Sequence, residues 1–205
     1  MDITGIISTA LKNVPSSYYI VRNPKSRNDQ LTGYSKDYTQ AELSFVARFY
    51  HEMMRIFESN AELSEYTDHY KMDTELYKKI IYSNKSEKPR YNDTREKYVT
   101  ETSRGVYPDF VFHKGQEFNN EEDQLLAMEI KAKTISKKEF EYDLFKTNLY
   151  IEELNFQHGI YLVVNNNNNL IQELFTEYKT SNYFNEQKCK VICKSNYESE
   201  IILIG

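Results

Sequence analysis

The 205-residue chain has no tryptophan, only 6 glycines and only 2 cysteines. The cysteines, Cys189 and Cys193, lie near the C-terminus with no histidine or third cysteine close by, so we expect reduced structural thiols rather than a zinc site or a disulfide. The few glycines form no phosphate-binding loop, and the chain has neither a G-x-S-x-G motif nor an evident Cys–His pair. Nucleotide-driven motors and the common serine and cysteine hydrolases are therefore not indicated.

Long apolar runs and an excess of positive charge are missing as well. No stretch approaches the ~20 apolar residues that a membrane-spanning helix needs, and the first residues lack the basic start and apolar run of a signal peptide. We therefore expect a cytoplasmic protein with no membrane partner. The net charge of −5 provides no overall basic field, which argues against a protein that passively coats a polyanion.

Hydrophobic residues make up 40% of the chain, enough for the core of a single domain over residues 1–205. Helical periodicity and runs of β-branched or aromatic residues locate the elements. The predicted helices cover 1–14, 40–59, 74–82, 139–155 and 170–178. The predicted strands cover 97–100, 106–113, 125–133, 158–164, 190–194 and 200–204. The domain then consists of an N-terminal arm at 1–39, a core at about 40–164 with a polar insert at 60–96, and a C-terminal extension at 165–205.

The helix predicted at 40–59 carries a carboxylate on its apolar side. Glu42 falls in the middle of the apolar stripe on a helical wheel. The stripe consists of Phe45, Val46, Phe49, Met53, Ile56 and Phe57. One explanation is local, because Thr39 as N-cap and Glu42 three residues later would form a capping box. The other is functional, with the carboxylate aimed at an active site, and the residues alone leave both open.

In two predicted strands, 106–113 and 125–133, the alternation of side chains can place acidic and basic residues on one face of the sheet. Side chains alternate between the faces of a strand, so Glu129 and Lys131 share a face, about 6.6 Å apart. If the register pairs Asp109 with Glu129, their Cβ atoms lie roughly 5 Å apart, close enough for two carboxylates to share a hard cation such as Mg²⁺. Lys131 could then orient a water molecule or neutralise a phosphoryl transition state. The alternative is an ordinary solvent-exposed sheet face.

Pro108-Asp109 is followed, after nineteen residues, by Glu129-Ile130-Lys131. This pattern resembles the motif of the PD-(D/E)xK, or restriction-endonuclease-like, nuclease superfamily. The resemblance implies that Asp109 and Glu129 bind Mg²⁺, for which Mn²⁺ can substitute, and that Lys131 assists the attacking water. A backbone carbonyl ligand would come from Ile130 or from Ala132. Glu42 matches the glutamate that many members carry near the start of the helix before the sheet.

The order of predicted elements is similar to the αβββαβ core of that superfamily. The implied fold class is α/β, with a mixed central sheet flanked by helices, a polar insert and a C-terminal extension. In the helix after the lysine strand, Asp143 and Lys146 resemble a pattern found in one branch, and Lys146 would reach either a phosphate or a surface salt bridge. His113 lies on the face of Asp109 and could approach the site. The basic stretch at 84–95 is either a contact for nucleic acid or a solvated surface.

We therefore expect a Mg²⁺-dependent nuclease that hydrolyses DNA phosphodiester bonds with a metal-activated water. DNA is the expected partner, and a homodimer is open because cutting both strands commonly requires two active sites. The rival is a non-catalytic module on the same fold that binds nucleic acid or protein. A chance motif on an unrelated α/β fold is a third possibility, and it predicts that Asp109 and Glu129 do not converge.

Overall fold

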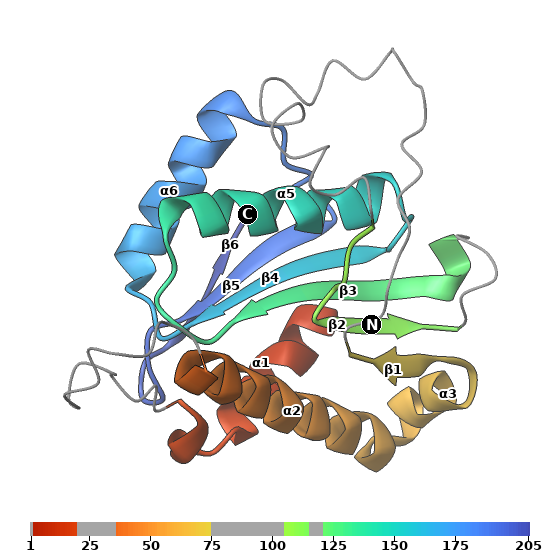
Figure 1. Ribbon diagram of the computed structural model, residues 1–205. Helices are drawn as coiled ribbons and strands as arrows, with labels where there is room; N and C mark the ends of the chain where they lie inside the picture. The colour runs from red at the N-terminus through yellow and green to blue at the C-terminus, as the bar shows by residue number, and fades with distance from the viewer. Residues whose placement is uncertain (1, 20–35, 75–104, 115–120) are drawn as a thin grey trace.

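The computed structural model describes residues 2–19, 36–74, 105–114 and 121–205. Its centre is a six-stranded mixed sheet in the order β1-β2-β3-β4-β5-β6, with helices on both faces (Figure 1). The strands are β1 (Lys71–Asp73), β2 (Phe110–His113), β3 (Gln124–Lys131), β4 (His158–Val164), β5 (Cys189–Lys194) and β6 (Ile201–Ile204). The helices are α1 (Ile3–Asn13), α2 (Lys36–Ser59), α3 (Ala61–His69), α5 (Lys137–Glu152) and α6 (Asn168–Ser181), with short 3₁₀ turns η1 (Ser16–Tyr18) and η3 (Glu121–Asp123).

Strand direction changes twice across the sheet. β1, β2 and β3 are antiparallel neighbours, β3, β4 and β5 are parallel, and β6 returns antiparallel to β5. Parallel neighbours need a crossover, which α5 provides between β3 and β4 and α6 provides between β4 and β5. Both crossover helices lie on one face of the sheet, while α1 and α2 lie on the other (Figure 1).

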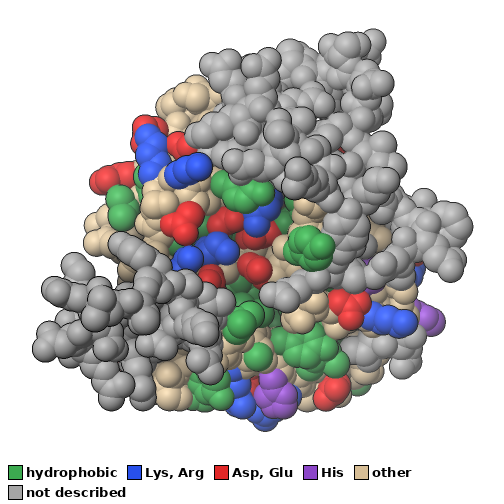
Figure 2. Space-filling view, in the orientation of Figure 1, with side chains coloured by type: hydrophobic (Ala, Val, Ile, Leu, Met, Phe, Trp, Pro, Cys, Tyr) green, Lys and Arg blue, Asp and Glu red, His purple; other side chains and the backbone are tan. Residues whose placement is uncertain are grey.

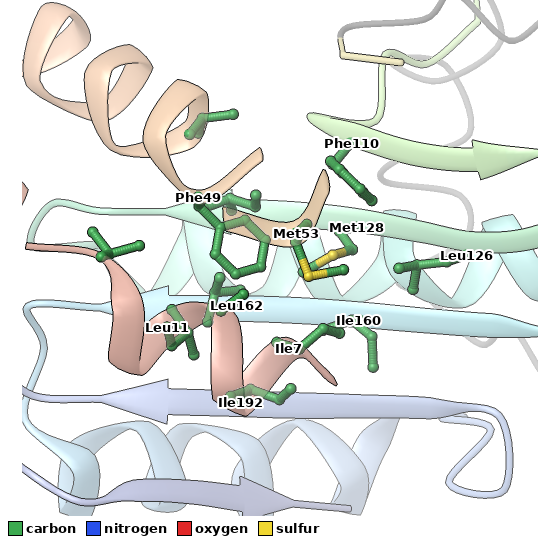
Figure 3. Packing of buried hydrophobic residues seen from close by; sticks show 14 of the residues in the cluster. Ile7, Leu11, Phe49, Met53, Phe110, Leu126, Met128, Ile160, Leu162 and Ile192 are labelled. Carbon is green, nitrogen blue, oxygen red and sulfur yellow. The ribbon is translucent and has the colours of Figure 1, made fainter. Parts of the chain in front are cut away.

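The face covered by α1 and α2 is closed by large apolar side chains. From α2, Phe49 and Met53 project onto the sheet, and from α1, Ile7 and Leu11 do so (Figure 3). They meet Phe110, Leu126, Met128, Ile160, Leu162 and Ile192 from four adjacent strands. All of these side chains are at most 1% exposed. Burying each contributes roughly 1.5–3 kcal/mol relative to leaving it in water, so α2 is anchored firmly beside β2 and β3.

The central strands are buried on both faces. β4 is a nearly continuous apolar run because α5 covers one side and α1 the other, as expected for a parallel strand with helices on both faces. In β3 the residues facing α1 and α2 are all apolar, whereas Glu129 faces α5 and is 0% exposed. A fully buried carboxylate in a central strand needs partners, and it marks where the core becomes polar.

The prediction of an α/β fold with a mixed sheet flanked by helices is confirmed. The crossover between parallel strands, the helix at 1–14 and the strand at 158–164 are also as expected. The start of α2 was predicted wrongly: the helix begins at Lys36, so Thr39 lies inside it and is not its N-cap. The first sheet strand is β1, which comes from the segment read as a polar insert. The predicted strand at 97–100, the helical residues 75–82 and the basic stretch at 84–95 lie outside the described residues.

No helix in the described part of the chain combines the length and the apolar character needed to cross a membrane.

Candidate functional site

The antiparallel register of β2 and β3 brings the two halves of the motif together. Phe110 pairs with Met128, and the same register continued by one residue sets Asp109 opposite Glu129. Asp109 directly precedes β2. The strand does not extend back over Pro108, which has no N–H to donate to a neighbouring strand. Its Oδ2 accepts a hydrogen bond from the backbone N–H of Ile130 at 2.7 Å. The carboxylate of Asp109 is therefore fixed to β3 at the residue after Glu129.

Two further side chains join Asp109 and Glu129 in one polar cluster. They are Lys131, from the end of β3, and Glu42, from α2. The Lys131 Nζ lies 3.8 Å from Glu42 Oε1 and 3.8 Å from Asp143 Oδ2. Glu42 Oε1 is buried at this position without a hydrogen-bond partner. Because α2 begins before Thr39, the capping box does not explain Glu42. Its carboxylate faces the cluster instead.

Helix α5 lays a row of polar side chains over Glu129. Lys146 forms an ion pair with the Glu129 carboxylate and a second one with Asp143 Oδ1 at 3.0 Å. Tyr150 donates its hydroxyl proton to the other oxygen of Glu129. Tyr161, from β4, donates to Asp143 Oδ2 at 3.2 Å. Lys146, whose side chain is 12% exposed, therefore forms a salt bridge as one of the two expectations had it, but a buried one rather than one on the surface.

Sequence reasoning did not identify Tyr150 and Tyr161 as part of this cluster. A signal for Tyr150 was present, because it follows Lys146 by four residues and therefore shares its helical face. Buried tyrosines also usually place their hydroxyl on a partner. Tyr161 stands directly beside Glu129 in the parallel register of β3 and β4, a relation that could be read only after that register was known.

Charge in the cluster is unbalanced. Four carboxylates, from Glu42, Asp109, Glu129 and Asp143, face the ammonium groups of Lys131 and Lys146, which leaves a formal charge of −2. Figure 2 shows acidic and basic side chains gathered in the middle of one face of the molecule. In a medium of low dielectric constant such an excess of negative charge is costly. A divalent cation would neutralise it.

Burial, more than the excess of negative charge, sets the pKa values of these carboxyl groups. Burial raises the pKa of Glu129 to about 8, and repulsion from Asp109 and Asp143 adds to the rise against the opposing effect of Lys146. Burial likewise raises the pKa of Asp109 and the pKa of Glu42. Burial alone would lower the pKa of Lys131, but the surrounding carboxylates, led by Asp143, outweigh it and raise that pKa. Lys131 is therefore an ammonium donor rather than a free base.

The donor set fits Mg²⁺ by oxygen chemistry and charge. Within the described residues, no three His, Cys, Asp or Glu side chains form a ready-made metal cage. Mg²⁺ does not require one, because it is usually held by one or two carboxylates and keeps several waters. Asp109 and Glu129 are the carboxylates that would serve such an ion. Each carboxylate oxygen has two lone pairs, so the contacts of Glu129 with Lys146 and Tyr150 leave it further acceptor capacity.

His113 does not join the cluster. Its Nε2 lies 2.9 Å from Asp73 Oδ2 on β1, and it stands at the far end of β2 from Asp109, about 13 Å along the strand at ~3.3 Å per residue. The register shift between Phe112 and His113 falls at the same place. Cys189 and Cys193 are free, buried thiols on β5.

Comparison with family models, with curated proteins and with solved structures finds no match for this chain. Its assignment to a superfamily accordingly remains the resemblance carried by Pro108-Asp109 and Glu129-Ile130-Lys131.

Proposed function

We propose that the chain is a Mg²⁺-dependent nuclease of the PD-(D/E)xK type that hydrolyses DNA phosphodiester bonds on a restriction-endonuclease-like core. The observation that carries the proposal is the convergence of Asp109, just before β2, with Glu129 and Lys131, near the end of β3, since these two parts of the sequence are twenty residues apart. A chance motif predicts no such convergence. The order α2, α3, β1, β2, β3, α5, β4 supports an αβββαβ core in which the short helix α3 is an addition.

Asp109 and Glu129 would hold the cation with their carboxylates, and the Ile130 carbonyl would add a backbone ligand. Glu42 would complete the shell or hold one of its waters, because its Oε1 is buried at the cluster and lacks a hydrogen-bond partner. When bound, Mg²⁺ supplies Lewis-acid polarisation of the phosphate and lowers the pKa of water.

Lys131 acts as a fixed positive charge in the proposed reaction. Its raised pKa keeps it protonated, so it donates hydrogen bonds to the attacking water or to a non-bridging phosphate oxygen and stabilises the charge that develops there. Its Nζ lies 3.8 Å from Glu42 and from Asp143, beyond a good hydrogen bond to either. Lys131 therefore retains donors for the substrate, whereas Lys146 is committed to Glu129 and Asp143.

The charge of the cluster makes DNA binding dependent on the cation. With all four carboxyl groups ionised, the formal charge of −2 repels a phosphodiester, and one divalent ion neutralises that charge. We therefore expect DNA to bind at the site only with Mg²⁺ or Mn²⁺ present. The expected location of the protein is the cytoplasm. If both strands of a duplex are cut, we expect a homodimer. The form of the nucleic acid is left to the experiment.

One observation favours a second candidate, a non-catalytic interaction module. Both oxygens of Glu129 are already engaged, by Lys146 and by Tyr150, as in a buried network whose role is structural. This candidate predicts that the cluster binds no divalent ion and that the protein cleaves no nucleic acid.

The test is cleavage of linear, circular and single-stranded DNA with Mg²⁺, Mn²⁺ or EDTA, using wild type, Asp109→Asn and a matched control. Asp123→Asn serves as the control because Asp123 lies on η3, pairing with Lys114 at 3.6 Å. We expect metal-dependent cleavage by wild type and by the control, and a loss of at least ~100-fold in Asp109→Asn. Failure to cleave any form, with no Mn²⁺ binding in calorimetry, would overturn the proposal in favour of the module.

A further inference from the structure

The two motif carboxylates are held in different ways. Asp109 has a short side chain, and a backbone N–H fixes one of its oxygens. Glu129 has one more rotatable bond, and among the residues that the structure describes no backbone N–H donates to its carboxylate. Its two oxygens are each contacted by a side chain of α5, one by the Lys146 ammonium and the other by the Tyr150 hydroxyl. The position of the Glu129 carboxylate therefore depends on α5.

The Tyr150 hydroxyl is itself placed rigidly. Tyr150 is 0% exposed and its ring packs edge-on against Phe156, with ring centroids 6.4 Å apart. The backbone carbonyl of Tyr150 accepts a hydrogen bond from the Phe156 N–H at 3.0 Å, which fixes the turn after α5 against the same ring. A ring enclosed in this way has few accessible rotamers. Its hydroxyl therefore stays in one place and restricts where the Glu129 oxygen that accepts its hydrogen bond can lie.

We propose that Tyr150 is a positioning residue that orients the Glu129 carboxylate toward the cation site. This inference rests on the proposed function, because it requires Glu129 to be a metal ligand. Tyr150 touches neither the cation nor the substrate in this account. Its hydroxyl occupies one lone pair of Glu129 and holds the carboxylate plane, so that the remaining lone pairs face Asp109. Groups that orient metal ligands in this way commonly change metal affinity about 10- to 100-fold when removed.

A substitution of Tyr150 tests the positioning of Glu129 separately from the charge of the cluster, whereas a substitution of Lys146 changes both. Removing Lys146 would both free the carboxylate and delete a positive charge that opposes a cation, two effects of opposite sign on affinity. Tyr150→Phe deletes a single neutral oxygen and leaves the ring packing in place. A variant with 4-aminophenylalanine in place of Tyr150 restores a donor at the same ring position.

The experiment is a calorimetric Mn²⁺ titration of the folded full chain at fixed pH, with folding checked by circular dichroism. Tyr19→Phe is the matched control, because Tyr19 is also a buried tyrosine and its hydroxyl donates to the Leu11 carbonyl at 2.8 Å, away from the cluster. We expect Tyr150→Phe to bind Mn²⁺ about 10- to 100-fold more weakly than wild type. The control should bind as wild type does, and 4-aminophenylalanine should restore most of the affinity.

Unchanged affinity in Tyr150→Phe, or no recovery with 4-aminophenylalanine, would overturn the positioning role while leaving the proposed function standing. Absence of Mn²⁺ binding by wild type would overturn the proposed function, and the positioning role with it. Glu129→Gln in the same titration distinguishes this site from any other, since binding there must fall when Glu129 loses its charge.

Discussion

Replacing Glu129 with glutamine is predicted to change how the stability of the cation-free protein depends on pH. The carboxyl group is 0% exposed, and burial is the largest cause of its raised pKa. Glutamine has nearly the same shape and accepts a hydrogen bond from Tyr150 or Lys146, but it does not titrate. The variant therefore removes one proton equilibrium while keeping most of the packing.

The size of the effect follows from proton linkage. Glu129 holds its proton up to a pKa of about 8 in the fold, compared with 4.5 as the ordinary value. Between these values the folded state binds more protons than the unfolded state, so the stability due to this group falls as pH rises. The slope is about 1.4 kcal/mol per pH unit, and the total over the window is at most roughly 5 kcal/mol.

Urea unfolding of wild type and Glu129→Gln in EDTA, at several pH values from 5 to 8, measures this directly. The free energy of unfolding of wild type minus that of the variant should decrease steadily with pH over this range. A flat difference would mean that Glu129 titrates normally in the fold. A difference that increases with pH would mean that Lys146 stabilises the carboxylate more than burial destabilises it, and would refute the reasoning.

Two further predictions concern the ion pair and the core. Lys146→Met should destabilise the protein by about 3–5 kcal/mol at pH 8, because it removes the ammonium group from a buried ion pair. The loss should be clearly smaller at pH 5, where Glu129 is protonated. Equal losses in urea unfolding at both pH values would contradict this prediction. Phe49→Ala should cost about 3–5 kcal/mol by opening a cavity between α2 and the sheet, whereas Leu43→Ala, 51% exposed on the same helix, should stay within about 0.5 kcal/mol. Thermal unfolding of the two variants side by side checks the second prediction, and a similar loss in both would contradict the packing described for α2.

The elements that the sequence predicted well are those whose burial is one-sided or complete. The apolar run at 158–164 has one plausible structure, a buried strand, and β4 has those bounds. The motif residues could likewise be assigned to a common face, because alternation along a strand is a local property. Their convergence was conditional, since register is set by pairing with another strand rather than by the strand itself.

The parts that were missed depend on tertiary contacts. β1 is Lys-Met-Asp with only Met72 buried, too short to show a period, and its pairing with β2 makes it a strand. The first turn of α2 has no apolar periodicity to announce it. Tyr150 carried only the weak signal of its helical spacing from Lys146, and its contact with Glu129 required α5 to be docked over β3.

The central claim is most directly tested by DNA cleavage with purified wild type, Lys131→Ala and Lys188→Ala, each with Mg²⁺ and with EDTA. Lys188 is the control because its ammonium forms an ion pair with Glu121 on the surface. The account predicts cleavage that requires Mg²⁺ in wild type and in Lys188→Ala, and its disappearance in a folded Lys131→Ala. Cleavage that persists in Lys131→Ala or in EDTA would contradict it.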